Sequence, residues 1–271
     1  MVRRYRDEFV FDMKCRILKT FRAAGRLLKP PVNNRFLFIL CPPYAGSTLM
    51  HEIICSSSQV SPTNIFGVRE GQGLPEIRKI VDYRREWDGK YLYPWPSIKA
   101  IWLRYWDTSK AVLMDKSPPN LLRAEAIQDN FDPASFIVMT RNPYAHAEGM
   151  MRRNGLSAEA AAEFTLQCLE YQRRNAETLR RRCVIRYEDL VLDPYAVKRR
   201  IDLFMPQLNG LHISKLYSAH NHKKRGMPIT DFNLESISRL SPEQKVILNR
   251  HFANEEALLS FFAYDLVTLE S

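Results

Sequence analysis

Residues 36–49 read FLFILCPPYAGSTL, a short apolar run that leads into a turn containing Gly-Ser-Thr. The consecutive apolar residues Phe36 to Cys41 are typical of a strand that is buried on both faces. Gly46 and the hydroxyl residues after it favour a turn into a helix, which we expect over Ser47 to Ser57. A loop placed between such a strand and such a helix presents free backbone N–H groups to a phosphate.

Similar apolar runs recur between stretches of helical periodicity. They lie at Ala111 to Met114, Phe136 to Met139 and Cys183 to Ile185. Further helices are expected over residues 121–130, 145–153, 158–182, 195–204 and 242–252. Residues 60–74, 91–96 and 218–233 follow neither pattern and are predicted to be loops. The alternation predicts an α/β fold with a P-loop-type parallel sheet flanked by helices.

The length of 271 residues and the 45% hydrophobic content allow one large core. We predict a single domain over residues 35–271, preceded by a basic amphipathic helix within residues 1–34. An apolar stripe runs along this helix at Phe9, Met13, Ile17, Phe21, Ala24 and Leu28. We favour a helix that packs on the domain with its basic face in solvent. The alternative is weak contact with an anionic membrane surface.

The net charge of +10 is interspersed with acidic residues, which favours anionic ligands and argues against a nucleic-acid partner. The five cysteines show no CxxC or metal-ligand spacing, so no metal site is expected. No signal peptide precedes them, which predicts a cytoplasmic location. No run approaches the roughly 18 apolar residues that would span a bilayer.

The loop after the first strand differs from a Walker A loop, which reads GxxxxGK[ST]. Cys41 stands in place of the first Gly, and Ser47 stands in place of the Lys. The loop instead resembles that of the sulfotransferase family, which runs Pro-Lys/Arg-Ser-Gly-Thr-Thr and binds the 5′-phosphosulfate of 3′-phosphoadenosine 5′-phosphosulfate (PAPS). The resemblance implies a donor site without magnesium, made by Tyr44, Ala45, Gly46, Ser47 and Thr48. Tyr44 departs from the family's catalytic Lys or Arg.

Two further segments resemble the 3′-phosphate site of this family. Arg141-Asn142-Pro143 follows a predicted strand, as the family's Arg-Asn-Pro does, and its Arg would bind the 3′-phosphate. The family places a Ser eight residues later, where this chain has Gly149, so one contact is expected to be missing. Lys224, Arg225 and Gly226 resemble the element that closes over the 3′-phosphate. Residues 186–190, Arg-Tyr-Glu-Asp-Leu, resemble a segment that is usually structural, and we assign it no catalytic role.

Transfer of a sulfuryl group needs a cation at the leaving phosphate and a base for the acceptor proton. Lys116 is our candidate cation, because its Lys-Ser-Pro sequence resembles an element of carbohydrate sulfotransferases; a surface Lys paired with Asp115 is the alternative. Glu70 is the candidate base, which Arg69 would keep ionised; a solvated loop carboxylate is nearly as well supported. His146 and Asp115 are reserve candidates for the base.

Aromatic residues gather between the loop that carries Glu70 and the strand before Lys116. We expect them to form the wall or lid of an acceptor pocket, although aromatic clusters are more often core. Pro94 and Pro96 favour a loop-rich cover. The residues are Trp87, Tyr91, Tyr93, Trp95, Trp102, Tyr105 and Trp106.

These motifs together predict a PAPS-dependent sulfotransferase that acts on a hydroxyl or amine of a small-molecule or carbohydrate acceptor. One alternative is a P-loop nucleotide kinase, which would require magnesium. Another is a non-catalytic PAPS-binding protein, which the departures at Tyr44 and Gly149 would favour.

Overall fold

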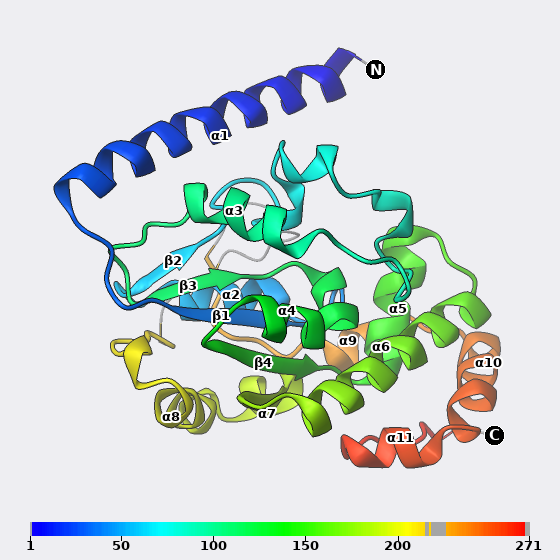
Figure 1. Cartoon of the computed structure of the whole chain (residues 1–271). Coiled ribbons are helices and arrows are strands. Elements are labelled where there is room, and N and C mark those ends of the chain that lie inside the picture. The colour runs from blue at the N-terminus through cyan, green and yellow to red at the C-terminus, as the bar shows by residue number, and fades with distance from the viewer. Residues whose placement is uncertain (1, 215–216, 218–225, 269–271) are drawn as a thin grey trace.

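The computed structural model describes residues 2–214, 217 and 226–268. At its centre is a five-stranded sheet in the order β2-β3-β1-β4-β5, in which all neighbouring strands are parallel (Figure 1). The predicted α/β fold with a parallel sheet flanked by helices is therefore confirmed. The strands are β1 (Arg35–Leu40), β2 (Val60–Pro62), β3 (Val112–Asp115), β4 (Ala134–Thr140) and β5 (Arg182–Arg186).

Every helix expected from the sequence is present, although α6 ends at Thr178 instead of Arg182. Four described helices were not expected: α3, α7, α9 and α11. The helices are α1 (Val2–Leu28), α2 (Ser47–Ile54), α3 (Trp95–Tyr105), α4 (Ala124–Asn130), α5 (Pro143–Asn154), α6 (Ala158–Thr178), α7 (Tyr187–Leu192), α8 (Pro194–Phe204), α9 (Asn233–Ser238), α10 (Pro242–Ala253) and α11 (Glu256–Phe261).

β1 is buried on both faces because its side chains alternate between two apolar layers. Leu37 and Ile39 pack in one cluster with Met50 of α2. Phe38 points to the opposite layer, where its ring lies 6.3 Å from that of Trp102. The continuous apolar run is thus explained by a strand with helices on each side.

Gln172 of α6 joins the ends of the two central strands. Its buried Nε2 donates to the carbonyl of Leu40 at 2.7 Å and to that of Met139 at 2.8 Å. Leu40 is the last residue of β1, and Met139 is the last but one of β4. One side chain therefore holds together the points from which two candidate binding segments begin.

α1 packs on the domain, as favoured, but through a different face from the apolar stripe. Cys15 and Leu18 are buried against the core, and Arg22 pairs with Asp107 at 3.1 Å. The stripe that begins at Phe9 is instead largely exposed. The periodicity predicted the helix correctly but assigned the wrong side to the domain.

The expected aromatic cover is wrong for three of its seven residues. Trp102 and Tyr105 of α3 and Trp106, which directly follows this helix, are fully buried core residues. Pro96 lies in the first turn of this helix, where the missing backbone N–H would have had no helical partner. The prolines therefore mark the start of a helix.

No described helix is both long and apolar enough to cross a membrane.

His146 ties α5 to α6 from a buried position. Its Nδ1 lies 2.8 Å from Thr165 Oγ1, and its ring stacks on Phe164 with the centroids 6.1 Å apart. Burial lowers the pKa of His146 to about 3, because the charged imidazole would lose its hydration. His146 is therefore neutral in the folded protein near neutral pH.

Replacing Gln172 with Leu should lower the free energy of unfolding by about 2 kcal/mol, since two buried carbonyls would lose their donor. Chemical denaturation of the purified protein measures this change. Gln167→Leu, on the exposed side of the same helix, is the matched control and should be nearly neutral. Equal losses in the two variants would show that Gln172 does not join the strands.

His146 should make the protein less stable as the pH falls below the ordinary histidine pKa. The unfolded chain binds a proton there that the folded chain does not, because the folded pKa is depressed. Between pH 7 and pH 5 the loss from this residue should be about 2 kcal/mol. His146→Gln should remove that part of the pH dependence in denaturation measured at both pH values. An unchanged slope would contradict the assignment.

Candidate active site

The loop after β1 enters α2 through Gly46, which has a φ of 95°. A Cβ on Gly46 would lie 2.8 Å from Tyr187 Cδ2 and 2.9 Å from Met139 Cε. Glycine is therefore required both by the backbone angle and by the packing of α7 and β4 against the loop. The first helical residue, Ser47, is buried, and Thr48 is partly exposed. The loop thus has the strand-to-helix form that the sequence predicted.

The two departures from the family pattern contact each other. A Cβ on Gly149 of α5 would lie 3.1 Å from Tyr44 Cβ, so the tyrosine packs directly on the glycine. The Tyr44 hydroxyl donates at 2.7 Å to Oδ1 of Asn154, the last residue of α5. Tyr44 itself has a φ of 59°, an uncommon angle for a residue with a side chain. Gly149 therefore accommodates the residue that replaces the family's cation.

Arg141 follows β4 and reaches across to the loop. Its Nη1 donates to the carbonyl of Tyr44 at 2.7 Å, and its Nε donates to Asn233 Oδ1 at 2.8 Å. The guanidinium lies over the Tyr187 ring, 4.7 Å from the centroid. Burial lowers the pKa of Arg141, since the charged form loses hydration. The acceptors of these two bonds are neutral, so the bonds do not cancel the guanidinium charge.

Glu188 organises the surroundings of Arg141. Its carboxylate accepts from the Asn142 N–H at 2.8 Å, from Asn233 Nδ2 at 2.6 Å and from the Tyr264 hydroxyl at 3.0 Å. Glu188 thus links the start of α5 to α9 and to the C-terminal segment. The segment at residues 186–190 therefore positions Arg141 through Tyr187 and Glu188.

Sequence reasoning missed Tyr187, Glu188 and Asn233 as parts of this site. A Tyr-Glu pair directly after an edge strand was the available signal for the first two residues. Asn233 had no such signal, because it is brought to Arg141 from a separate helix 92 residues later.

Lys116 and Glu70 form an ion pair with Nζ and Oε1 3.1 Å apart. Lys116 follows the last residue of β3, and its Nζ also donates to the Val68 carbonyl at 2.9 Å. The Lys116 side chain is 3% exposed and that of Glu70 is 26% exposed. The lysine is therefore a buried cation, which excludes the surface-lysine alternative. The carboxylate is the more accessible partner.

Asp115 anchors the segment that carries Glu70. Its Oδ1 accepts from the Gly71 N–H at 2.9 Å, and its Oδ2 accepts from Asn120 Nδ2 at 2.9 Å. A Cβ on Gly71 would lie only 2.3 Å from Asp115 Oδ1, so this close approach needs glycine. Burial raises the pKa of Asp115 to about 6. Asp115 is fully enclosed and serves as an anchor, and Lys116 pairs with Glu70.

Arg69 reaches a different carboxylate from the one that we expected. Its Nη1 pairs with Glu52 Oε1 of α2 at 2.6 Å. The pair fastens the residue next to Glu70 onto the helix that follows the phosphate loop. Lys116 supplies the described ion pair of Glu70.

The two candidate cations approach the loop from β3 and β4, the strands on either side of β1. Burial raises the pKa of the Cys41 thiol to about 12, whereas Lys116 and Arg141 both act to lower it. Both charges are therefore felt at the first residue after β1. The reserve candidate His146 is enclosed beneath this region and 2% exposed, so it cannot contact an acceptor in this arrangement.

The third predicted binding segment is only partly covered. Lys224 and Arg225 lie outside the described residues. Gly226 is exposed and directly precedes Met227, which bridges to Tyr217. Within the described part of the chain, no group of three or more His, Cys, Asp or Glu side chains could hold a metal ion.

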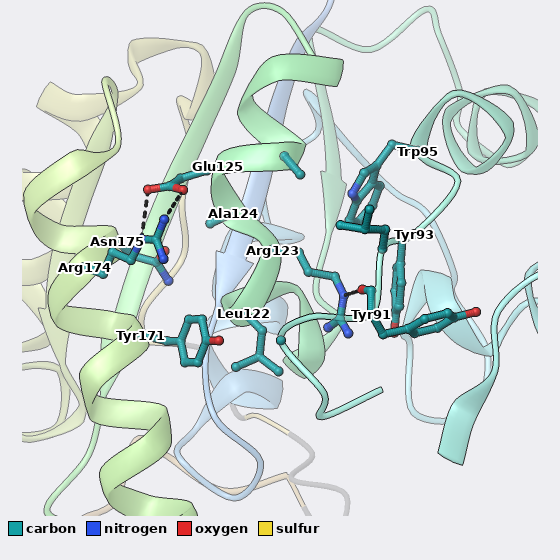
Figure 2. Close-up of a pocket in the computed structure, with 13 residues that line it drawn as sticks. Tyr91, Tyr93, Trp95, Leu122, Arg123, Ala124, Glu125, Tyr171, Arg174 and Asn175 are labelled. Atoms are coloured by element: carbon teal, nitrogen blue, oxygen red, sulfur yellow. Dashed lines mark hydrogen bonds and ion pairs between the residues drawn. The ribbon is translucent and has the colours of Figure 1, made fainter. Parts of the chain in front are cut away.

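A cavity of about 210 Å³ lies between the segment before α3, α4 and α6 (Figure 2). Tyr91, Tyr93, Trp95 and Tyr171 line it, so part of the predicted aromatic set does face a cavity. Arg123 projects at its wall. The guanidinium stacks on Tyr93 at 4.0 Å and donates to the carbonyls of residues 86, 88, 91 and 119. Arg123 thereby fixes the segment that borders the cavity.

Comparison with solved structures identifies similar folds. The sulfotransferase domain of the Synechococcus PCC 7002 olefin synthase is 23% identical, with a TM-score of 0.51 over 88% of this chain and 98% of that chain. The sulfotransferase domain of the curacin biosynthetic pathway is 18% identical, with a TM-score of 0.52 over 86% and 99%. A sulfotransferase from Alicyclobacillus acidocaldarius is 17% identical, with a TM-score of 0.52 over 87% and 98%. At these identities the likeness concerns the fold.

The comparison with curated proteins gave no match. The model of the sulfotransferase family matches residues 37–205, which include most of β1 with its loop, the Lys116 and Glu70 pair, and Arg141. Because this match spans more than half of the chain, the protein belongs to the sulfotransferase family.

Proposed function

We propose that the protein transfers a sulfuryl group from PAPS to a hydroxyl or amine of a small-molecule or carbohydrate acceptor. The observation that carries this proposal is the ion pair between Lys116 and Glu70, which are 46 residues apart in the sequence. A cation and a carboxylate meet beside a phosphate-type loop, and these are the two groups that the reaction needs.

The residues around the loop suit an anionic donor. The backbone N–H groups of residues 44–48, with the hydroxyls of Ser47 and Thr48, would hold the 5′-phosphosulfate. Arg141 would hold the 3′-phosphate, because a desolvated guanidinium with neutral hydrogen-bond partners gains most from a doubly charged ligand. Gly149 adds only backbone there. Lys224, Arg225 and Gly226 are proposed to close over the same phosphate on the strength of the resemblance.

The donor supplies the sulfuryl group and leaves as 3′,5′-bisphosphoadenosine. Glu70 would accept the proton from the acceptor atom that bonds to sulfur. Lys116 would balance the charge on the phosphate oxygen whose bond to sulfur breaks. In the resting protein the pair holds the two groups in place. Tyr44 has no part in the charge balance, because its hydroxyl is turned to Asn154.

A non-catalytic PAPS-binding protein is the second candidate function, favoured by the packing of Tyr44 on Gly149. The pairing of buried Lys116 with the more accessible Glu70 speaks for catalysis. A nucleotide kinase is less well supported, since Ser47 occupies the position of the Walker lysine.

We include a cytoplasmic location in the proposal. All five cysteines are free thiols, and disulfides persist mainly in oxidising compartments.

Donor recognition can be tested without knowing the acceptor, by calorimetric titration. We expect 3′,5′-bisphosphoadenosine to bind, and binding to be lost when the 3′-phosphate is absent. Titration with ATP and magnesium is the comparison. A preference for ATP with magnesium would overturn the proposed donor, and binding of neither nucleotide would do the same.

Variants of the proposed catalytic pair and of the proposed binding residue should affect different steps. Lys116→Ala should lower transfer to an identified acceptor by about a hundredfold or more, with bisphosphate binding largely intact. Glu70→Gln should have a similar effect through loss of the base. Arg141→Ala should instead weaken bisphosphate binding by about a hundredfold.

The exposed residues Lys79 and Arg84 provide controls of matched chemistry as Lys79→Ala and Arg84→Ala. Neither variant should change transfer or binding. Normal turnover in Lys116→Ala would refute the assigned cation. The unaltered protein could bind the bisphosphate and yet transfer no sulfuryl group to any acceptor in a broad screen. That result would favour the non-catalytic candidate.

A further inference from the structure

The side of α1 that faces away from the domain is apolar. We call its exposed large side chains the outer stripe. Most of them are spaced by four residues and so lie along one face of the helix. The outer stripe consists of Phe9, Met13, Ile17, Phe21, Leu27 and Leu28, which are 71%, 45%, 48%, 71%, 89% and 83% exposed.

The opposite side of α1 holds the helix in a fixed orientation. Lys19 pairs with Glu76, and Arg78 pairs with Asp12. Arg26 donates to the Leu103 carbonyl at 3.3 Å. α1 lies along the outside of the domain (Figure 1). Turning the outer stripe toward the domain would break these contacts. The stripe therefore remains exposed on the surface of the protein.

Basic side chains border the outer stripe on both sides. Lys14 and Arg16 are exposed, and their positions on the helix place them at its two edges. The exposed carboxylate of Glu8 lies one heptad before buried Cys15, and so on the domain side. Residues 2–28 contain eight basic and three acidic residues. A second copy of the chain would bring these basic edges against each other, whereas an anionic surface would attract them.

We propose that the outer stripe of α1 binds an anionic phospholipid surface, with the helix parallel to the bilayer plane. A helix with an apolar face between basic edges buries that face at the boundary of headgroups and acyl chains. α1 is not apolar enough to cross the bilayer. The proposed cytoplasmic location fits, because the cytoplasmic leaflet carries the anionic lipids.

This binding mode would also orient the candidate active site. α1 contacts the segment that carries Glu70, because Lys14 lies over the Phe66 ring at 5.9 Å and Lys19 pairs with Glu76. The segment is therefore on the same side of the domain as the bound lipid. Acceptors held at the membrane surface would be presented to that side.

Sedimentation with lipid vesicles tests the proposal. The full chain should sediment with vesicles of phosphatidylcholine mixed with phosphatidylglycerol, and much less with phosphatidylcholine alone or at high salt. Phe9→Ser combined with Phe21→Ser should reduce the bound fraction about tenfold or more. Leu192→Ser combined with Leu203→Ser is the matched control, because these leucines are 87% and 83% exposed on α7 and α8. The control should bind as the unaltered chain does.

Circular dichroism melting of each variant establishes that it is folded. Absence of binding to anionic vesicles, or equal loss in both double variants, would overturn the proposal. Light scattering could instead detect a dimer that dissociates when Phe9→Ser is combined with Phe21→Ser. This result would also overturn the proposal, since the stripe would then join two copies. None of these outcomes depends on sulfuryl transfer, so they are separate from the test of the proposed function.

Discussion

The parallel pairing of β1 with β3 and β4 brings three chemically distinct segments to one edge of the sheet. Parallel neighbours end at the same side, so the residues that follow them lie at one end of the sheet. The loop containing Gly46 follows β1, Lys116 follows β3, and Arg141 follows β4. Gln172 adds to this constraint from α6, because it bonds to the ends of β1 and β4 at once. The positions of the candidate donor site and of the candidate cation both depend on this alignment.

The strands that form this edge could be predicted because each is a continuous apolar run enclosed by two layers. β2 could not, since its three residues Val60–Pro62 include a serine and a proline and carry no apolar pattern. The face of α1 was misassigned because its more apolar side is the exposed one. The domain side combines buried Cys15 and Leu18 with charged residues that pair with the domain. The aromatic residues of α3 were misassigned for a related reason, since exposure depends on neighbours distant in the sequence.

Individual residues of the candidate site could be found from local motifs, but their contacts could not. Lys116 and Glu70 were chosen for separate roles, and only the fold shows that they are paired. Taken separately, Tyr44 and Gly149 each stand where the family usually has a different residue. In the structure they form one packing arrangement, in which the glycine leaves room for the tyrosine. A departure from a family motif is therefore best judged together with the residues that it contacts.

The anchoring of Gly71 by Asp115 makes the proposed base and cation parts of one stiff unit. The backbone beside Glu70 is bonded to the residue beside Lys116, so the two groups are linked both by their own ion pair and by the bond between their neighbours. The segment fixed by Arg123 borders the cavity and is not part of this unit, so its sequence could change without disturbing the charge pair. A scaffold of this kind lends itself to exchange of its peripheral segments between relatives, which would alter the range of acceptors while the chemical step is kept.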